Sequence, residues 1–180
     1  MNNGFNFRDI KKFKKQLEKL EENKDAFIES CTKEIAARLL AKVKKLTPVY
    51  EKPKIKEATV EVKGVSGESK SFLDADTARY QQYWAGYVGG TLRRGWVIGD
   101  IIKENGVYRI DVTNSVEYAR YVEYGHRQKK GRYVPALGKA LSKSWVIGKF
   151  MLTISEQEIE SITPKLLESK IKAFLKEHIK

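Results

Sequence analysis

Apolar residues recur every three or four positions over residues 10–46, which is the spacing of one face of an α-helix. A helix over about residues 6–21 is predicted by Ile10, Phe13, Leu17 and Leu20. The spacing resumes after Asn23, a favoured N-cap residue, with Ile28, Cys31, Ile35, Leu39, Val43 and Leu46. Pro48 disfavours helical backbone at Thr47, so the second and longest helix is predicted to end there.

The next stretch changes to a period of two. Val60 and Val62 would share one face of a strand or hairpin arm within residues 55–65. We expect an exposed turn at Ser66–Ser71 and a short helix at Asp74–Trp84.

The Asn105-Gly106 pair gives the clearest local signal, because Asn-Gly supplies the positive φ angles of a two-residue type I′ turn. It predicts a hairpin of Trp96–Glu104 and Val107–Thr113. In the register that this turn sets, the facing pairs are Glu104 with Val107, Ile101 with Ile110, and Gly99 with Val112.

This register separates the hairpin into two faces. The face expected to meet the helices carries Val97, Ile101, Tyr108, Ile110 and Val112. The opposite face carries Trp96, Ile98 and Ile102 beside Arg109, Asp100 and Asp111. That mixed face is too apolar to leave wholly in water, which favours a contact with another subunit.

A short helix is predicted next, because Tyr118, Ala119 and Val122 have helical spacing. Ser115 is its expected N-cap, and Gly125 its left-handed C-terminal stop. A loop at His126–Arg132 follows, with four fixed positive charges and no apolar anchor, so we expect it to be mobile in isolation.

The C-terminal part is predicted to be helical from about residue 155 to residue 180. Trp145–Leu152 has the pattern of a strand or extended connector, and Ser155 with Glu158 forms a capping box that would begin a helix. Pro164 suits the first position of a new helical segment or a single kink. The chain is therefore expected to be α+β, with a small antiparallel sheet around a central Asn-Gly hairpin, packed on a long N-terminal helix and C-terminal helices.

Length and composition favour one ordinary domain over residues 1–180, which would bury roughly 70% of the surface of its unfolded chain. Cys31 is the lone cysteine and lies in the apolar stripe, so we interpret it as a small core residue. The first 12 residues lack a signal-peptide pattern, and no segment approaches the ~20 apolar residues of a membrane span. We expect a protein made in the cytosol that has no membrane contact.

Charge biases the choice of partner without deciding it. The chain has 35 Lys and Arg against 23 Asp and Glu, a formal net charge of +12. Acidic protein surfaces and DNA are equally eligible partners. Much of the excess alternates with acidic residues along the helices and is typical of a solvated face.

Patterns of catalytic or ligand-binding chemistry are weak. His126 and His178 are the only histidines and are far apart, so they supply no spaced metal-ligand set. No phosphate-binding loop pattern is present. Asp100 and Asp111 could face each other in the hairpin, but a salt bridge with a residue such as Arg109 is a far commoner role than metal-dependent catalysis. We therefore predict no enzyme activity, no catalytic residue, no metal site and no cofactor.

Three segments carry a family resemblance. They are Lys45–Val49, with Pro48 next to Val49 at the end of the long helix, then Gly90-Thr-Leu-Arg93, then Tyr118–Gly125. In this order they resemble the head-tail joining family of tailed bacteriophages, also described as minor tail or tail-completion components of lambdoid phages. The matching motif positions are Pro48, Gly90, Leu92, Arg93, Tyr118, Ala119, Val122, Glu123 and Gly125.

The resemblance implies a structural virion protein that forms a ring, hexameric in the family, in the phage neck. Its partners would be copies of itself and the neck, connector and tail-terminator proteins, with DNA passing through the lumen without specific binding. Contacts are expected through Arg94, Trp96, His126, Arg127, Lys129, Lys130 and Arg132. Glu123 could accept hydrogen bonds from Arg93, Arg94 or an arginine of a neighbouring subunit. The chain departs from the family by an insert at about residues 50–88, to which no family role can be assigned.

Two alternatives remain open from the sequence. One is a basic nucleic-acid-binding module that uses Arg127, Lys129, Lys130 and Arg132 on phosphates and Tyr80, Tyr83 and Trp84 for base stacking. We favour the simpler interpretation that these aromatic residues cover the protein's own surface or a neighbouring subunit, because only Arg79 adds a cation among them. The other alternative is a neighbouring neck protein such as the tail terminator.

Overall fold

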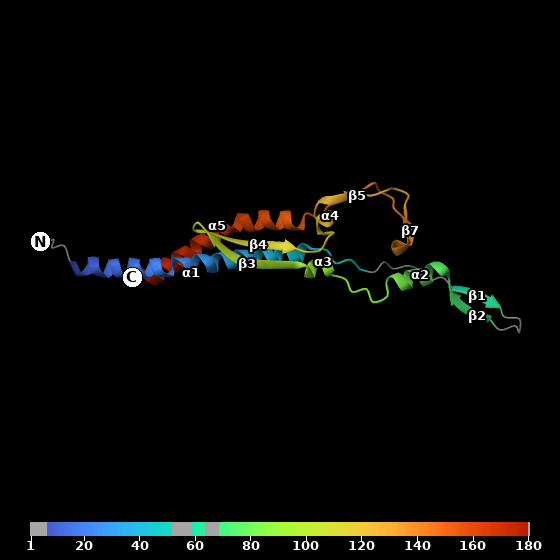
Figure 1. The fold of residues 1–180 in the computed structure, drawn as a ribbon, viewed down its shortest axis with the longest axis horizontal. Helices are drawn as coiled ribbons and strands as arrows, with labels where there is room; N and C mark the ends of the chain where they lie inside the picture. The colour runs from blue at the N-terminus through green and yellow to red at the C-terminus, as the bar shows by residue number, and fades with distance from the viewer. Residues whose placement is uncertain (1–6, 52–58, 64–68, 180) are drawn as a thin grey trace. The chain divides into compact units, whose positions relative to one another are not determined.

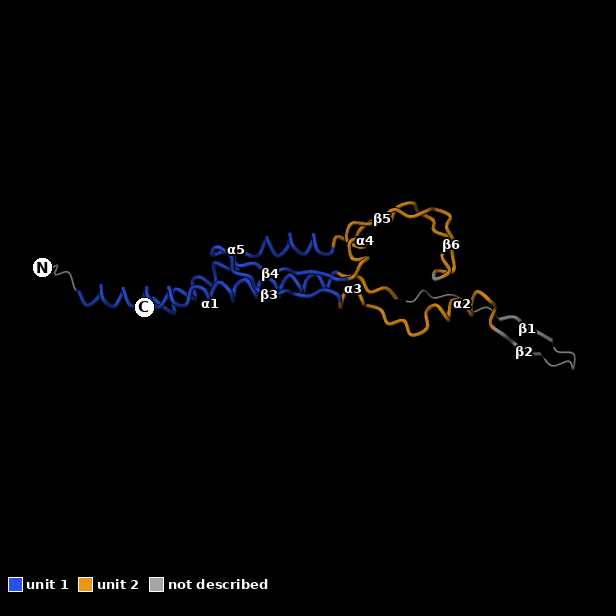
Figure 2. The backbone as a smooth tube through the Cα atoms, in the orientation of Figure 1, with its two compact units in different colours: residues 1–46, 95–115, 151–180 blue, residues 47–94, 116–150 orange. Residues whose placement is uncertain are grey.

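The computed structural model describes residues 7–51, 59–63 and 69–179. Contacts divide the chain into two compact units (Figure 2). The first unit combines residues 1–46, 95–115 and 151–180, and the second combines residues 47–94 and 116–150. Helices and small antiparallel sheets make up the fold, which confirms the α+β class.

The first unit packs two long helices and one hairpin (Figure 1). Its elements are α1 (Phe7–Leu46), β3 (Trp96–Glu104), β4 (Val107–Asn114) and α5 (Met151–His178). Helix α1 contacts α5 and both strands. The buried apolar residues of this unit are Cys31, Ala36, Val43, Trp96, Met151 and Ile159. The interpretation of Cys31 as a core residue is confirmed.

Helix α1 is continuous, so the predicted helix break before Asn23 is wrong. The Asn23 side chain does not cap a new helix; its Nδ2 donates to the Lys19 carbonyl one turn earlier, at 2.7 Å. Ion pairs one turn apart, such as Lys24 with Glu21, stabilise the same stretch. Asparagine can bond its own backbone in either arrangement, and the shared apolar stripe favours the unbroken helix.

Helix α5 begins earlier than the sequence predicted. Phe150 has a positive φ of 48°, which ends the extended chain, and the helix starts at Met151. Ser155 is therefore buried inside the helix, where its hydroxyl donates to the Met151 carbonyl. Pro164 also lies inside α5 and starts no new helix. The helix changes direction along its length (Figure 1), as an internal proline favours.

The hairpin has the predicted turn-proximal register but contains a bulge. Glu104 pairs with Val107 and Ile101 with Ile110, and both turn residues have positive φ. Beyond that point Ile98, not Gly99, pairs with Val112. Gly99 and Asp100 thus lie opposite the single residue Asp111, and the extra residue reverses which side chains point inward.

The bulge corrects the predicted faces of β3. Trp96 is only 4% exposed and Ile98 is partly buried, whereas Val97, expected to face the helices, is 50% exposed. Trp96 therefore belongs to the protein's interior and cannot serve as the exposed subunit contact expected of it. Arg109 does pair with Asp111, at 3.3 Å, as predicted.

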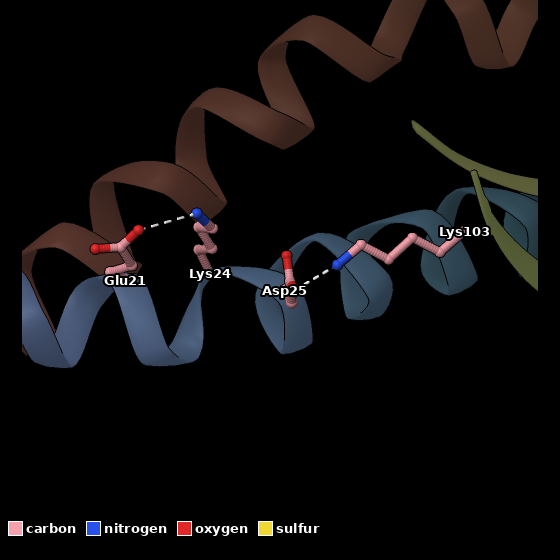
Figure 3. Close-up of polar contacts among 4 residues, drawn as sticks. All are labelled: Glu21, Lys24, Asp25 and Lys103. Atoms are coloured by element: carbon pink, nitrogen blue, oxygen red, sulfur yellow. Dashed lines mark hydrogen bonds and ion pairs between the residues drawn. The ribbon is translucent and has the colours of Figure 1, made fainter. Parts of the chain in front are cut away.

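Ion pairs connect α1 to its neighbours in the unit. Figure 3 shows Lys103 of β3 reaching Asp25 of α1, at 2.5 Å, next to the Lys24–Glu21 pair. The hydrogen bond from Lys103 lowers the pKa of the Asp25 carboxyl. Glu34 of α1 similarly binds Lys170 of α5, which lowers the pKa of Glu34. The Lys103–Asp25 and Lys24–Glu21 pairs are about half exposed or more, so their contribution to stability is modest. Glu34 and Lys170 are less exposed, at 30% each.

The second unit is built from short elements. They are β1 (Thr59–Lys63), β2 (Ser69–Leu73), α2 (Ala75–Tyr83), α3 (Thr91–Arg94), α4 (Ala119–Tyr124), β5 (Gly125–Arg127), β6 (Tyr133–Val134), the 3₁₀ helix η1 (Pro135–Leu137), β7 (Lys139–Ala140) and β8 (Trp145–Ile147). Strand β1 lies in the predicted strand region, of which residues 55–58 and 64–65 are outside the described residues. Ser69–Ser71 belong to β2, so that part of the predicted turn at Ser66–Ser71 is wrong.

The predicted helix at Asp74–Trp84 is confirmed as α2. Asp74 caps it by accepting a 2.8 Å hydrogen bond from the Thr77 amide. Hydrogen bonds from Thr77 also lower the pKa of the Asp74 carboxyl. Among the helices of the described residues, none has a stretch long and apolar enough to cross a membrane.

Candidate functional site

The three motif segments meet within the second unit. Arg93 of α3 donates from Nε and Nη2 to the carbonyl oxygen of Thr47, at 3.2 and 2.7 Å. Thr47 is fully buried, so the guanidinium satisfies a carbonyl left over at the end of the long helix. Arg94 donates to the Gly89 carbonyl at 2.9 Å. Both arginines thus donate to backbone oxygens, and the expected hydrogen bond to Glu123 stays a prediction.

The two glycines before α3 allow the motif segments to approach closely. A Cβ on Gly89 would lie 2.8 Å from the Tyr50 carbonyl oxygen, and Gly90 has a positive φ of 89°. The Tyr87 hydroxyl donates to the same Tyr50 carbonyl at 3.2 Å. The glycine pair is therefore a packing requirement of the segment after Pro48.

A cavity of about 320 Å³ lies where the motifs meet. Its lining residues are Pro48, Tyr50, Tyr87, Gly90, Thr91, Leu92, Tyr118 and Val122. The lining thus brings together motif residues that are distant in sequence. They are Pro48, Gly90, Leu92, Tyr118 and Val122. Leu92 is buried, and Tyr118 is 46% exposed at the rim.

The aromatic residues of α2 and its C-terminal flank form a cluster centred on Trp84. Tyr50, Tyr80, Tyr83 and Tyr87 all lie within 6.2 Å of the Trp84 ring, measured between ring centroids. Tyr80 and Trp84 are buried, at 4% and 8% exposure. They are not available for base stacking, which corrects that part of the nucleic-acid alternative. The cluster instead packs α2 against the chain that follows Pro48.

Helix α4 ends at a close backbone crossing. Its first residue is Ala119 and its N-cap is Tyr118 without a side-chain cap, so the predicted Ser115 cap is wrong. Gly125 ends the helix with φ 85° and ψ 174°, which is the predicted positive φ but an extended rather than a left-handed helical backbone. Across from it, the amide of Lys149 donates to the Val122 carbonyl at 2.7 Å.

Gly125 and Gly148 fill this crossing together. A Cβ on Gly125 would lie 2.3 Å from the Val146 carbonyl oxygen, and one on Gly148 would lie 2.1 Å from the Glu123 carbonyl oxygen. Such distances are not possible for real side-chain carbons, so both positions require glycine. Gly125 was predicted as a motif residue, whereas Gly148 was considered only as a bulge.

Residues 125–147 form a two-stranded arm. Of the loop predicted at His126–Arg132, His126 and Arg127 belong to its strand β5, whereas residues 128–132 lie between strands β5 and β6. Strand β5 pairs with β8, and the pairing continues through Gln128, whose amide donates to the Ser144 carbonyl at 2.9 Å. Further out, β6 pairs with β7 on either side of η1. His126 and Arg127 are therefore strand residues with backbone partners. The expectation failed because the partner strand lies 18 residues later in the sequence.

The arm is strongly basic. From residue 125 to residue 150 the sequence has no Asp or Glu, and its cations are Arg127, Lys129, Lys130, Arg132, Lys139, Lys143 and Lys149. All seven are exposed, and no ion pair among the described residues involves any of them. Sequence reasoning recognised only the first four; the missing carboxylates over the whole stretch were the available signal.

One face of the arm places an aromatic side chain beside a cation. Trp145 lies directly opposite Arg127 in the β5–β8 register, and Ile147 lies two residues along the same face. Trp145 is 49% exposed and Ile147 is 74% exposed. His126 points to the other face, where it is half-buried and its ring contacts Tyr121. The exposed face suits contact with another molecule.

The described residues contain no group of three or more His, Cys, Asp or Glu side chains that could hold a metal ion. The Asp100–Asp111 region, considered for catalysis, holds a β-bulge and an Arg109 ion pair. Glu123 is buried, at 5% exposure, and its carbonyl accepts a hydrogen bond from the Phe150 amide at 3.0 Å.

A comparison with protein families identifies the family of most of the chain. The family model described as "Bacteriophage HK97-gp10, putative tail-component" matches residues 11–125, which are 115 of the 180 residues. This range includes all three motif segments and ends at the glycine that begins the arm. Searches of curated proteins and of solved structures gave no match.

Proposed function

Since this chain belongs to the HK97-gp10-like family of bacteriophage tail components, we propose that it forms a ring in the phage neck that joins head-completion proteins to the tail. As a structural component of a phage tail, it is a virion protein. In the proposal the ring is hexameric, lies next to the tail terminator, and completes the tail before joining. In this proposal the protein acts by binding its neighbours in a fixed geometry, without a catalytic step.

The observation that supports the proposal best is the glycine-fixed arm. The family motifs converge on one cavity, and the last motif residue, Gly125, begins an arm whose exposed face carries Arg127, Trp145 and Ile147. A two-stranded sheet also leaves unpaired backbone groups along its edges. A closed ring needs unlike faces that complement each other between neighbours, and such an arm provides one of the two faces.

We expect the isolated protein to associate poorly and to form its ring only with its neck partners. The double variant Trp145→Ser and Ile147→Ser should not be incorporated into tails, because it lacks the apolar part of the arm's exposed face. The unfolding temperature should change little, since Ile147 is 74% exposed and Trp145 is 49% exposed.

The measurement is light scattering of the isolated protein together with quantification of the chain in purified tails. Val107→Ser is the matched control, because Val107 is 67% exposed but lies in the first unit. Normal incorporation of the arm variant, or absence of the polypeptide from the head-tail junction in a cryo-EM map, contradicts the proposal.

A second candidate function, nucleic-acid binding, is favoured by the seven unpaired cations of the arm. Proteins that neutralise phosphates bind with an affinity that falls steeply as salt rises. Trp145 replaces the buried Trp84 as the available stacking surface beside these cations. In the neck proposal, the same cations would meet DNA only while the DNA passes through the lumen of the ring.

Removal of three arm charges separates the two candidates. In the nucleic-acid candidate, Lys129→Gln, Lys130→Gln and Arg132→Gln together should reduce the slope of log affinity against log salt by about 2–3 for a short duplex. The control removes the same charge from α1 through Lys11→Gln, Lys12→Gln and Lys15→Gln, and should leave the slope nearly unchanged. Fluorescence anisotropy at several salt concentrations measures both. Absence of binding by the unaltered protein at low salt eliminates this candidate.

A further inference from the structure

The first turns of α1 carry an apolar stripe that the rest of its unit leaves exposed. Phe7, Ile10, Phe13 and Leu17 recur at three- and four-residue spacing, and their exposed fractions are 74%, 45%, 50% and 43%. Helix α5 ends before this segment: Phe174 stacks on Phe27 at 4.3 Å, only four residues before α5 ends at His178 (Figure 1). An apolar stripe of this kind is typical of a helix that packs against a partner.

A complementary apolar groove lies between α1 and α5 in the same unit. This open depression of about 620 Å³ has Ile35, Leu39, Ile159, Thr163 and Pro164 on its floor and walls. Two carboxylates, Glu156 and Glu160, line its rim. Neither forms an ion pair with another described residue.

Charge matches the stripe to the groove. Exposed lysines flank the stripe at Lys11, Lys12, Lys14 and Lys15, and the residues that line the groove include only acidic charges. Two stripes laid side by side in parallel would instead bring these lysines together, which is unfavourable. The groove is therefore a better partner for the stripe than a second stripe is.

The stripe cannot reach the groove of its own chain. Phe13 and Ile35 belong to one continuous helix and are separated along it by about 33 Å at 1.5 Å per residue. A second copy must therefore supply the stripe. Because stripe and groove are different surfaces, each copy can give one and receive one, as a closed ring of identical subunits requires.

We propose that residues 7–17 of one copy dock through this stripe into the α1–α5 groove of a neighbouring copy. The inference rests on the proposed homo-oligomeric assembly and names an interface for it. The arm belongs to the other unit of the chain, so its exposed face stays available for a second contact in the assembly.

Photo-crosslinking from Phe13 tests the interface without assuming a register. With Phe13→p-benzoylphenylalanine, we expect intermolecular crosslinks in purified tails that map to residues 35–39 and 156–164 of another copy. Val107→p-benzoylphenylalanine is the control and should give none in that region. Crosslinks to residues 7–17 of another copy, which indicate a stripe-to-stripe pair, overturn the proposal, as does an absence of intermolecular crosslinks.

A charge exchange separates electrostatic docking from a chance encounter. Lys11→Glu, Lys12→Glu and Lys15→Glu should lower the crosslinking yield about tenfold, because like charges then meet at the rim. Adding Glu156→Lys and Glu160→Lys should restore it. Failure of the restoration contradicts this docking mode.

Native mass spectrometry of the ring extracted from tails distinguishes the two levels of failure. A ring without these crosslinks removes the interface but leaves the proposed function standing. Absence of any ring of this chain removes the assembly on which both depend.

Discussion

Gly125→Ala is expected to destabilise the protein by about 3 kcal/mol or more, a large part of the stability of a typical domain. Two effects add. The residue has φ 85° and ψ 174°, a conformation that is essentially restricted to glycine, and its new Cβ would lie 2.3 Å from the Val146 carbonyl oxygen. Strands β5 and β8 would have to separate at the base of the arm. Thermal unfolding should shift downward by about 6–12 °C, and trypsin should cleave within the arm sooner.

Two other glycines serve as matched controls. Gly148→Ala tests the crossing alone, since its Cβ would lie 2.1 Å from the Glu123 carbonyl oxygen without a positive φ; we expect a similarly large loss. Gly131→Ala tests the backbone angle alone, because Gly131 has φ 83° but no atom within 4 Å of a new Cβ. It should cost about 1–2 kcal/mol. Equal unfolding temperatures for the Gly125 and Gly131 variants would show that the crossing is not tight.

Trp96→Ala is expected to cost about 3–5 kcal/mol, the usual range for truncating a large buried aromatic residue. Trp96 is 4% exposed because the bulge at Gly99 and Asp100 turns it to the inner face of β3. The loss should appear in the isolated chain as a lower midpoint of chemical denaturation. An exposed subunit contact would behave differently: its removal would weaken association and leave the isolated chain as stable as before.

Val97→Ala is the control for this prediction. Val97 is the next residue of the same strand and is 50% exposed, so its truncation should cost less than about 1 kcal/mol. Comparable losses for the two variants would mean that β3 lacks the bulge and that the register follows the simple alternation.

Local signals in the sequence predicted most of the elements in the first unit. The three- and four-residue spacing identified the helical segments of α1, and Asn105-Gly106 set the pairing of Glu104 with Val107. Errors arose where a residue has two local uses. Asn23 can cap a helix or bond within one, and Ser155 can begin a helix or bond to the carbonyl of Met151. Packing of neighbouring segments decided between these uses.

The candidate site depended more on distant partners. The motif order identified Arg93 and Gly125, but the acceptor of Arg93 is a carbonyl 46 residues earlier, and a carbonyl belongs to every residue type. Likewise, the strand partner of His126 and Arg127 is Val146 and Trp145, which no local pattern connects to them. The first two residues of the predicted loop are therefore strand residues of the arm.

The sequence by itself determined the helical periodicity, the hairpin turn, the motif residues and the concentration of positive charge after Gly125, because each depends on neighbours within a few positions. Only the tertiary structure decided the continuity of α1, the bulge that buries Trp96, and the closing of the arm at Gly125 and Gly148. These features arise from contacts between segments far apart in the chain, and the energy of such contacts depends on where the backbone goes.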